Sequence, residues 1–86
     1  MMEVHGIDMR REAYRISAPV DGIDVKGFVP EGLVMEMLGI DRRPGHGEVY
    51  AWLEKHLSAV EAAMTKRYTG GVPKAPFDRI TLAEDA

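Results

Sequence analysis

Residues 14–29 read YRISAPVDGIDVKGFV, and most of what the chain reveals about its fold follows from them. Apolar and polar residues alternate on both sides of Asp21-Gly22, as they do in strands that bury one face. Asp-Gly favours the positive φ angles of a two-residue type I′ turn, whose twist matches that of the paired strands. The stretch therefore predicts a β-hairpin.

A two-residue turn also sets the register of the hairpin. It pairs Val20 with Ile23, Ala18 with Val25, Ile16 with Gly27 and Tyr14 with Val29, and the apolar members then share one face. Pro19 has no backbone N–H to donate. Its presence predicts that the first strand lies at an edge of the sheet, or that Pro19 lies on the unpaired side of the ladder.

Two helices and a last strand are expected after the hairpin. Pro30-Glu31 begins a short helix, and Gly39 ends it. A long amphipathic helix is predicted from Glu48 to Tyr68, because apolar residues recur there at spacings of three and four. Its stripe consists of Val49, Leu53, Leu57, Val60, Met64 and Tyr68. Residues 77–82 alternate as a final strand.

These elements predict an α+β fold with a small antiparallel sheet, made of the hairpin plus the C-terminal strand and covered by one short and one long helix. The length of 86 residues fits a single domain over residues 1–86. Residues 1–12 are expected either to be loosely ordered or to add a short strand.

Composition narrows the class of protein. The chain has no cysteine, which excludes disulfides, thiolate metal sites and a thiol nucleophile, and favours a reducing cytoplasm. No apolar run at the N-terminus is long enough for a signal peptide or membrane span, so a cytoplasmic location is expected. Eleven Lys and Arg against fourteen Asp and Glu give a net charge of -3, the wrong sign for a protein that mainly holds phosphate backbones.

Several short segments, in their order along the chain, resemble a family of small uncharacterised bacterial proteins, domain of unknown function 1488. They are Val20-Asp21-Gly22, Glu31-Gly32-Leu33, Leu38-Gly39, the long helix with Glu61 and Ala62, and Ile80-Thr81-Leu82-Ala83-Glu84-Asp85. The resemblance covers the chain from about Tyr14 to Asp85. It implies an α+β fold with helices packed on a small antiparallel sheet, and it implies no catalytic or binding residues.

Candidate catalytic groups are few. His5, His46 and His56 share no metal-ligand spacing, and neither serine lies in a nucleophile elbow. Gly45-His46-Gly47 lacks the other residues of a phosphate-binding loop and is better interpreted as a flexible linker. We therefore expect no catalytic site, no cofactor and no metal, and the chain is predicted not to be an enzyme.

Trp52 is the most informative residue of the long helix. Helical projection places it beside His56, Ala59 and Ala63, away from the centre of the apolar stripe. In one interpretation the stripe is broad and Trp52 covers an edge of the sheet. In the other, the four residues form an interaction surface, since small alanines beside a tryptophan permit close approach by another chain.

The leading hypothesis is therefore a small non-catalytic cytosolic interaction module, which self-associates or docks on a protein partner. The alternative is a nucleic-acid-associated accessory protein that acts through its basic clusters, although nucleic acid is the less favoured partner. The clusters are Arg10-Arg11, Arg15, Arg42-Arg43, Lys66-Arg67, Lys74 and Arg79. An enzyme that acts through isolated carboxylates ranks third.

Overall fold

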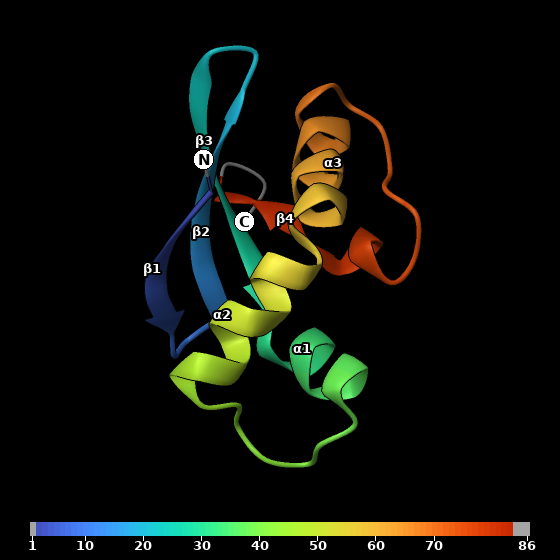
Figure 1. Cartoon of the computed structure of the whole chain (residues 1–86). Helices are drawn as coiled ribbons and strands as arrows, with labels where there is room; N and C mark the ends of the chain where they lie inside the picture. Colours follow the sequence, from blue (N-terminus) through green and yellow to red (C-terminus); the bar gives the residue numbers. More distant parts are fainter. Residues whose placement is uncertain (1, 84–86) are drawn as a thin grey trace.

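The computed structural model describes residues 2–83, which form a small α+β domain with an antiparallel sheet and helices packed against it (Figure 1). In chain order the elements are β1 (Glu3–Asp8), β2 (Ala13–Val20), β3 (Ile23–Pro30), α1 (Glu31–Leu38), α2 (His46–Lys55), α3 (Leu57–Tyr68), the 3₁₀-helix η1 (Phe77–Arg79) and β4 (Thr81–Leu82). Within residues 2–83, no helix has the length and apolar character needed to cross a membrane.

The predicted hairpin is confirmed, together with its register. All four expected pairs occur between β2 and β3, from Val20 with Ile23 at the turn to Tyr14 with Val29 at the far end. Asp21 and Gly22 have φ angles of 52° and 78°, as a type I′ turn requires. The apolar face of this hairpin forms one wall of the core.

The sheet has the order β1-β2-β3-β4 with antiparallel neighbours throughout. The N-terminal segment therefore adds a strand, the second of the two alternatives left open for it. It also makes β2 an inner strand, so the first alternative for Pro19, an edge strand, is wrong, and the second, a place on the unpaired side of the ladder, is the one that holds. The last pair of β1 joins Glu3 to Ser17, and Pro19 lies beyond it, where its missing N–H breaks no pairing.

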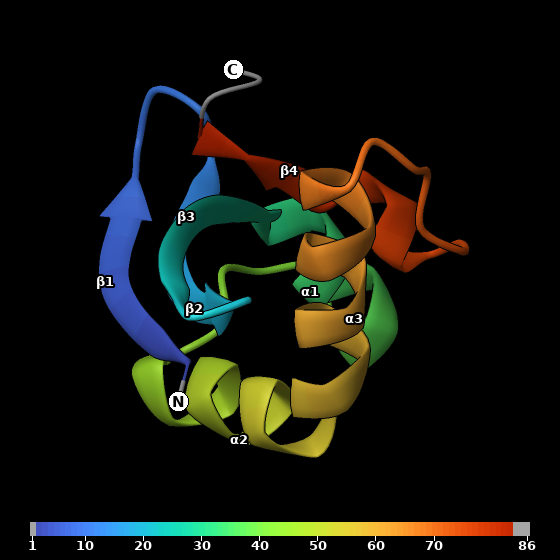
Figure 2. The same ribbon diagram turned by 90° about the horizontal axis from the view of Figure 1, so that it is seen from above.

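All three α-helices cover the same face of the curved sheet (Figures 1 and 2). α1 follows β3 directly and ends at Gly39, whose φ of 70° confirms the predicted stop. The predicted long helix is wrong as a single element. The helical segment begins at His46 and is divided into α2 and α3 at His56, whose φ of -109° and ψ of 20° are not helical.

The division at His56 changes the direction of the chain, and α3 leads away from α2 at a steep angle (Figure 2). α2 thereby lies beside β1, whereas α3 packs on β2 and β4. Val60 and Met64 of α3 are fully buried. Leu57, expected near the centre of the stripe, is only half-buried because it lies at the bend.

The final strand is shorter than predicted. Residues 77–79 form η1, and only Thr81 and Leu82 pair with β3, opposite Phe28 and Gly27. A Cβ atom on Gly27 would lie 2.8 Å from the Thr81 carbonyl oxygen, so glycine allows β4 to approach. Arg67 of α3 holds this segment by donating hydrogen bonds to the backbone oxygens of Asp78 (2.6 Å) and Ile80 (3.2 Å).

Candidate functional site

The hypothesis that Trp52, His56, Ala59 and Ala63 form an exposed interaction surface is wrong. Trp52 and Ala63 are each only 3% exposed and belong to the core, whereas His56 and Ala59 are half-buried. The rings of His56 and Phe77 lie 5.1 and 6.3 Å from the Trp52 ring. The C-terminal part of this same chain therefore covers Trp52, and the interpretation of Trp52 as a core residue is the one that holds.

A groove remains beside the covered tryptophan, between α3 and residues 72–77. We name it the alanine groove, and its volume is about 510 Å³. It is lined by Ala59, Ala62, Ala63, Lys66, Val72, Pro73, Lys74, Ala75 and Phe77. Two residues of the expected surface, Ala59 and Ala63, thus border a hollow. Its other wall is the segment 72–77, whose place beside α3 was not predicted from the sequence.

A second apolar groove runs between β1 and α2, and we name it the edge groove. It consists of two adjoining hollows of about 290 and 480 Å³, which share Val4 and Tyr50. The first is also lined by Gly6, Ile7, Tyr14, Arg43, Pro44, Gly45, His46 and Val49, and the second by Met2, Glu3, Leu53, Glu54 and Leu57. Tyr50 is 54% exposed, a large apolar surface for a residue outside the core.

The strand that borders the edge groove is an outer strand of the sheet. β1 pairs with β2 on one side, and on its other side residues 2–83 contribute no further strand. Its register with β2 shifts between Val4 and Ile7, where Gly6 has a φ of 101°. This β-bulge was not predicted, because a single glycine in a six-residue segment gives a weak signal.

Two buried polar atoms of the described residues lack a hydrogen-bond partner, the Tyr14 hydroxyl and Trp52 Nε1. Burial raises the pKa of Tyr14 above its ordinary value of 10.0, the charge of Glu31 raises it further, and Arg43 opposes both. Tyr14 is one wall of the edge groove. Each of these atoms carries the free-energy cost of a polar group removed from water.

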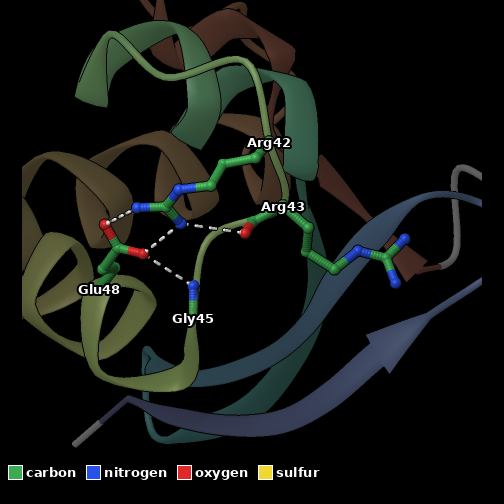
Figure 3. A network of polar contacts seen from close by, with 4 residues as sticks. All are labelled: Arg42, Arg43, Gly45 and Glu48. Atoms are coloured by element: carbon green, nitrogen blue, oxygen red, sulfur yellow. Dashed lines mark hydrogen bonds and ion pairs between the residues drawn. The ribbon is translucent and has the colours of Figure 1, made fainter.

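The start of α2 is closed by a network of polar contacts (Figure 3). Arg42 donates through Nη1 and Nη2 to the two carboxylate oxygens of Glu48 at 2.8 and 3.0 Å, and the Gly45 N–H donates to Glu48 Oε1 at 2.9 Å. The hydrogen bond from Arg42 is the main cause that lowers the pKa of Glu48 to about 2. An internal carboxylate thus occupies the place where a phosphate loop would bind its ligand.

Most of the basic clusters contain an arginine that contacts another part of this chain. Arg43 donates to Glu31 at 2.7 Å, Arg79 pairs with Glu36, and Arg11 lies 3.7 Å from Asp8. A smaller basic group lies on the sheet face opposite the helices. There Arg15 and Lys26 border a hollow next to Phe28, and the Arg11 guanidinium lies 4.6 Å from the centre of the Phe28 ring.

The three histidines lie in three different places. His5 shares a hydrogen bond of 2.8 Å with Ser17, His46 stacks on Tyr50, and His56 contacts Trp52. Among residues 2–83, no three His, Asp or Glu side chains are arranged to hold a metal ion.

No family model matches the chain, and no curated protein or solved structure matches it either. The resemblance to domain of unknown function 1488 therefore stays a prediction. Its last two residues, Glu84 and Asp85, lie outside the part of the chain that the structure describes.

Proposed function

We propose that this chain is a small, non-catalytic interaction module of the bacterial cytoplasm, which binds an extended segment of a partner protein at the edge groove. The observation that carries the proposal is an outer strand, β1, lying beside two adjoining apolar hollows. Strand addition to a sheet edge uses this combination: backbone hydrogen bonds supply affinity, and pockets for alternate side chains supply specificity.

The shape of the edge groove suits an extended occupant. Tyr50 and Val4 line both hollows, so alternate apolar side chains of an added strand could enter the hollows on either side of this shared pair. The bulge at Gly6 interrupts the outer edge, and bulges of this kind hinder unselective edge-to-edge pairing. Affinity therefore depends on side chains that fit the hollows as well as on the backbone.

Charge favours a partner with basic residues over a second copy of this chain. Glu3 and Glu54 line the end of the edge groove that lies near Leu57. A basic residue at the matching end of the added segment would be attracted there. If two copies of β1 paired about their centre, Glu3 would face Asp8 of the other copy, and like charges directly opposite each other destabilise a pair of strands.

A library of random linear peptides displayed on phage tests this proposal. We expect enrichment of peptides with apolar residues at alternate positions and a basic residue near one end. Tyr50→Ala removes the large side chain that both hollows share and should weaken binding of the selected peptides about thirtyfold, the effect of losing an interface anchor worth about 2 kcal/mol. Tyr68→Ala is the matched control, because Tyr68 is 39% exposed on α3 and lines neither hollow.

Three results would contradict the proposal. They are a library that yields no enriched peptide, selected peptides that bind Tyr50→Ala as tightly as the wild type, and light scattering that shows a stable dimer whose interface contains Tyr50. The last would make a second copy the occupant.

The alternative, a nucleic-acid accessory protein, has support from one group of residues. Arg11, Arg15 and Lys26 surround Phe28 on the uncovered sheet face, and cations around an aromatic ring are a common arrangement for single strands. The net charge of -3 opposes such binding. A fluorescent single-stranded probe that shows no anisotropy change at about 50 mM salt, where phosphate contacts are strong, would remove this alternative.

A further inference from the structure

We propose that the alanine groove is a binding site for a small apolar anion, namely a medium-chain carboxylate. This site is separate from the edge groove and does not depend on the function proposed for it. The size of the hollow, its lining and the charges at its border support this assignment.

The hollow exists because one face of α3 carries only small side chains. Ala59, Ala62 and Ala63 lie at spacings of three and four, so they share a face of the helix. Residues 72–77 pass over this face, and Phe77 lies at the inner end, where its ring contacts Trp52. The volume of about 510 Å³ lies within the range of small-molecule sites.

The charge at the groove has one sign. Among the residues that the structure describes, Lys66 and Lys74 are the only charged ones that line it, and all the others are apolar. Within residues 2–83, neither lysine takes part in an ion pair. An apolar cavity with two ammonium groups and no carboxylate is complementary to a ligand with an apolar body and a negative head.

The stem of Lys66 packs beside the end of its own helix. It crosses directly over the backbone of Gly71, because a Cβ atom on Gly71 would lie 2.7 Å from Lys66 Cε. A lysine whose stem is packed loses less side-chain freedom when it binds an anion. Gly71 therefore leaves room for the Lys66 side chain, whereas Gly70, with a φ of 90°, is the glycine in the left-handed region at the end of α3.

Titration with octanoate tests the proposal, and Trp52 provides the signal. Trp52 is the single tryptophan, and its ring lies 6.3 Å from that of Phe77, which lines the groove. We expect octanoate to change the tryptophan fluorescence saturably and to bind at least tenfold more tightly than octylammonium, which has the same chain and the opposite charge. Acetate, which lacks the chain, should give no change.

Variants of the two lysines distinguish a specific binding site from nonspecific hydrophobic binding. Lys66→Met and Lys74→Met keep the chain length and remove the charge, and each should weaken octanoate about tenfold, as expected for a lost charge-assisted contact. Gly71→Ala keeps both charges and should also weaken binding, because it displaces the Lys66 stem. Lys55→Met is the matched control, since Lys55 is an exposed lysine of α2 outside the groove.

Several outcomes would overturn the inference. The first is the absence of a saturable signal up to about 10 mM octanoate, the weakest affinity that would be useful. The others are equal binding of octanoate and octylammonium, and unchanged octanoate binding in both lysine variants when their urea midpoints are also unchanged. Binding of anionic phospholipid vesicles without binding of octanoate would also overturn it. Tyr50→Ala should leave octanoate binding unchanged, so that failure here and failure at the edge groove are distinguishable.

Discussion

Replacing Tyr14 by phenylalanine should stabilise this protein, although loss of a tyrosine hydroxyl usually does the reverse. Tyr14 is 7% exposed, and its hydroxyl is buried without a hydrogen-bond partner among the described residues. A buried polar group that lacks a partner costs about 1 to 3 kcal/mol. Tyr14→Phe removes that group, keeps the ring between β1 and β3, and leaves no cavity. We therefore expect a gain of about 1 to 3 kcal/mol in the free energy of unfolding.

Urea denaturation at neutral pH measures this gain, and thermal melting should show it as a rise of about 4 to 8 °C for each kcal/mol in a domain of this size. Alkaline pH should enlarge the difference in the free energy of unfolding between Tyr14→Phe and the wild type. Burial and the charge of Glu31 raise the pKa of Tyr14 above 10.0, so the folded state holds the phenolic proton more tightly than the unfolded chain does. The stability that the wild type gains from holding this proton is fully present below pH 10.0 and is lost as the pH rises through the pKa of Tyr14 in the folded state. Tyr14→Phe has no phenolic proton, so its stability does not fall for this reason.

A loss of about 1 kcal/mol or more in Tyr14→Phe at neutral pH would refute the reasoning, because it would show that the hydroxyl makes a hydrogen bond worth keeping. A difference between wild type and variant that stays constant from pH 7 to pH 11 would refute the part that concerns the pKa.

Three further changes test other parts of the structure. Trp52→Ala should cost about 3 to 5 kcal/mol of stability in chemical denaturation, because it empties a core site, and a cost below 1 kcal/mol would contradict the burial of the ring. Gly22→Val forces a β-branched residue to a φ of 78° and should cost about 1 to 2 kcal/mol or more, whereas an unchanged denaturation midpoint would argue against the type I′ turn. An NMR titration should give Glu48 a pKa of about 2, and Arg42→Met should raise it towards 4.5. Because the pKa of Glu48 is lowered in the folded state, its contribution to stability is present above pH 4.5 and lost as the pH falls through about 2, and this acid sensitivity should shrink in Arg42→Met.

The hairpin was predictable because its signals are local and agree with one another. Asp21-Gly22 specifies both the turn and its length, and the alternation on either side then has only one register that buries Tyr14 and Val29 together. Gly39 gave an equally local signal for the end of α1. Where residues close together in the sequence determine a turn or a helix end, that element can be predicted from a single sequence.

The bend at His56 and the cover over Trp52 depend on tertiary contacts. Lys55-His56-Leu57 contains neither glycine nor proline, so nothing local marks the end of α2. The apolar flank of Trp52 was predicted from the sequence, but the residue that covers it was not. That residue is Phe77, whose segment alternates like a strand and forms a 3₁₀-helix instead. The bulge in β1 and the edge groove beside it likewise arise from packing between distant segments.

The cover over Trp52 has a consequence for how the protein is made. Synthesis proceeds from the N-terminus, so α2 leaves the exit tunnel of the ribosome before Phe77 does. Until then the indole ring has no cover from η1, and the nascent chain presents an aromatic surface on which a chaperone or another nascent chain can settle. Once residues 77–82 have emerged, Arg67 donates hydrogen bonds to the backbone oxygens of Asp78 and Ile80, and Phe77 covers the indole ring. A nascent chain with α2 outside the exit tunnel and Phe77 still inside it should therefore have its tryptophan open to solvent.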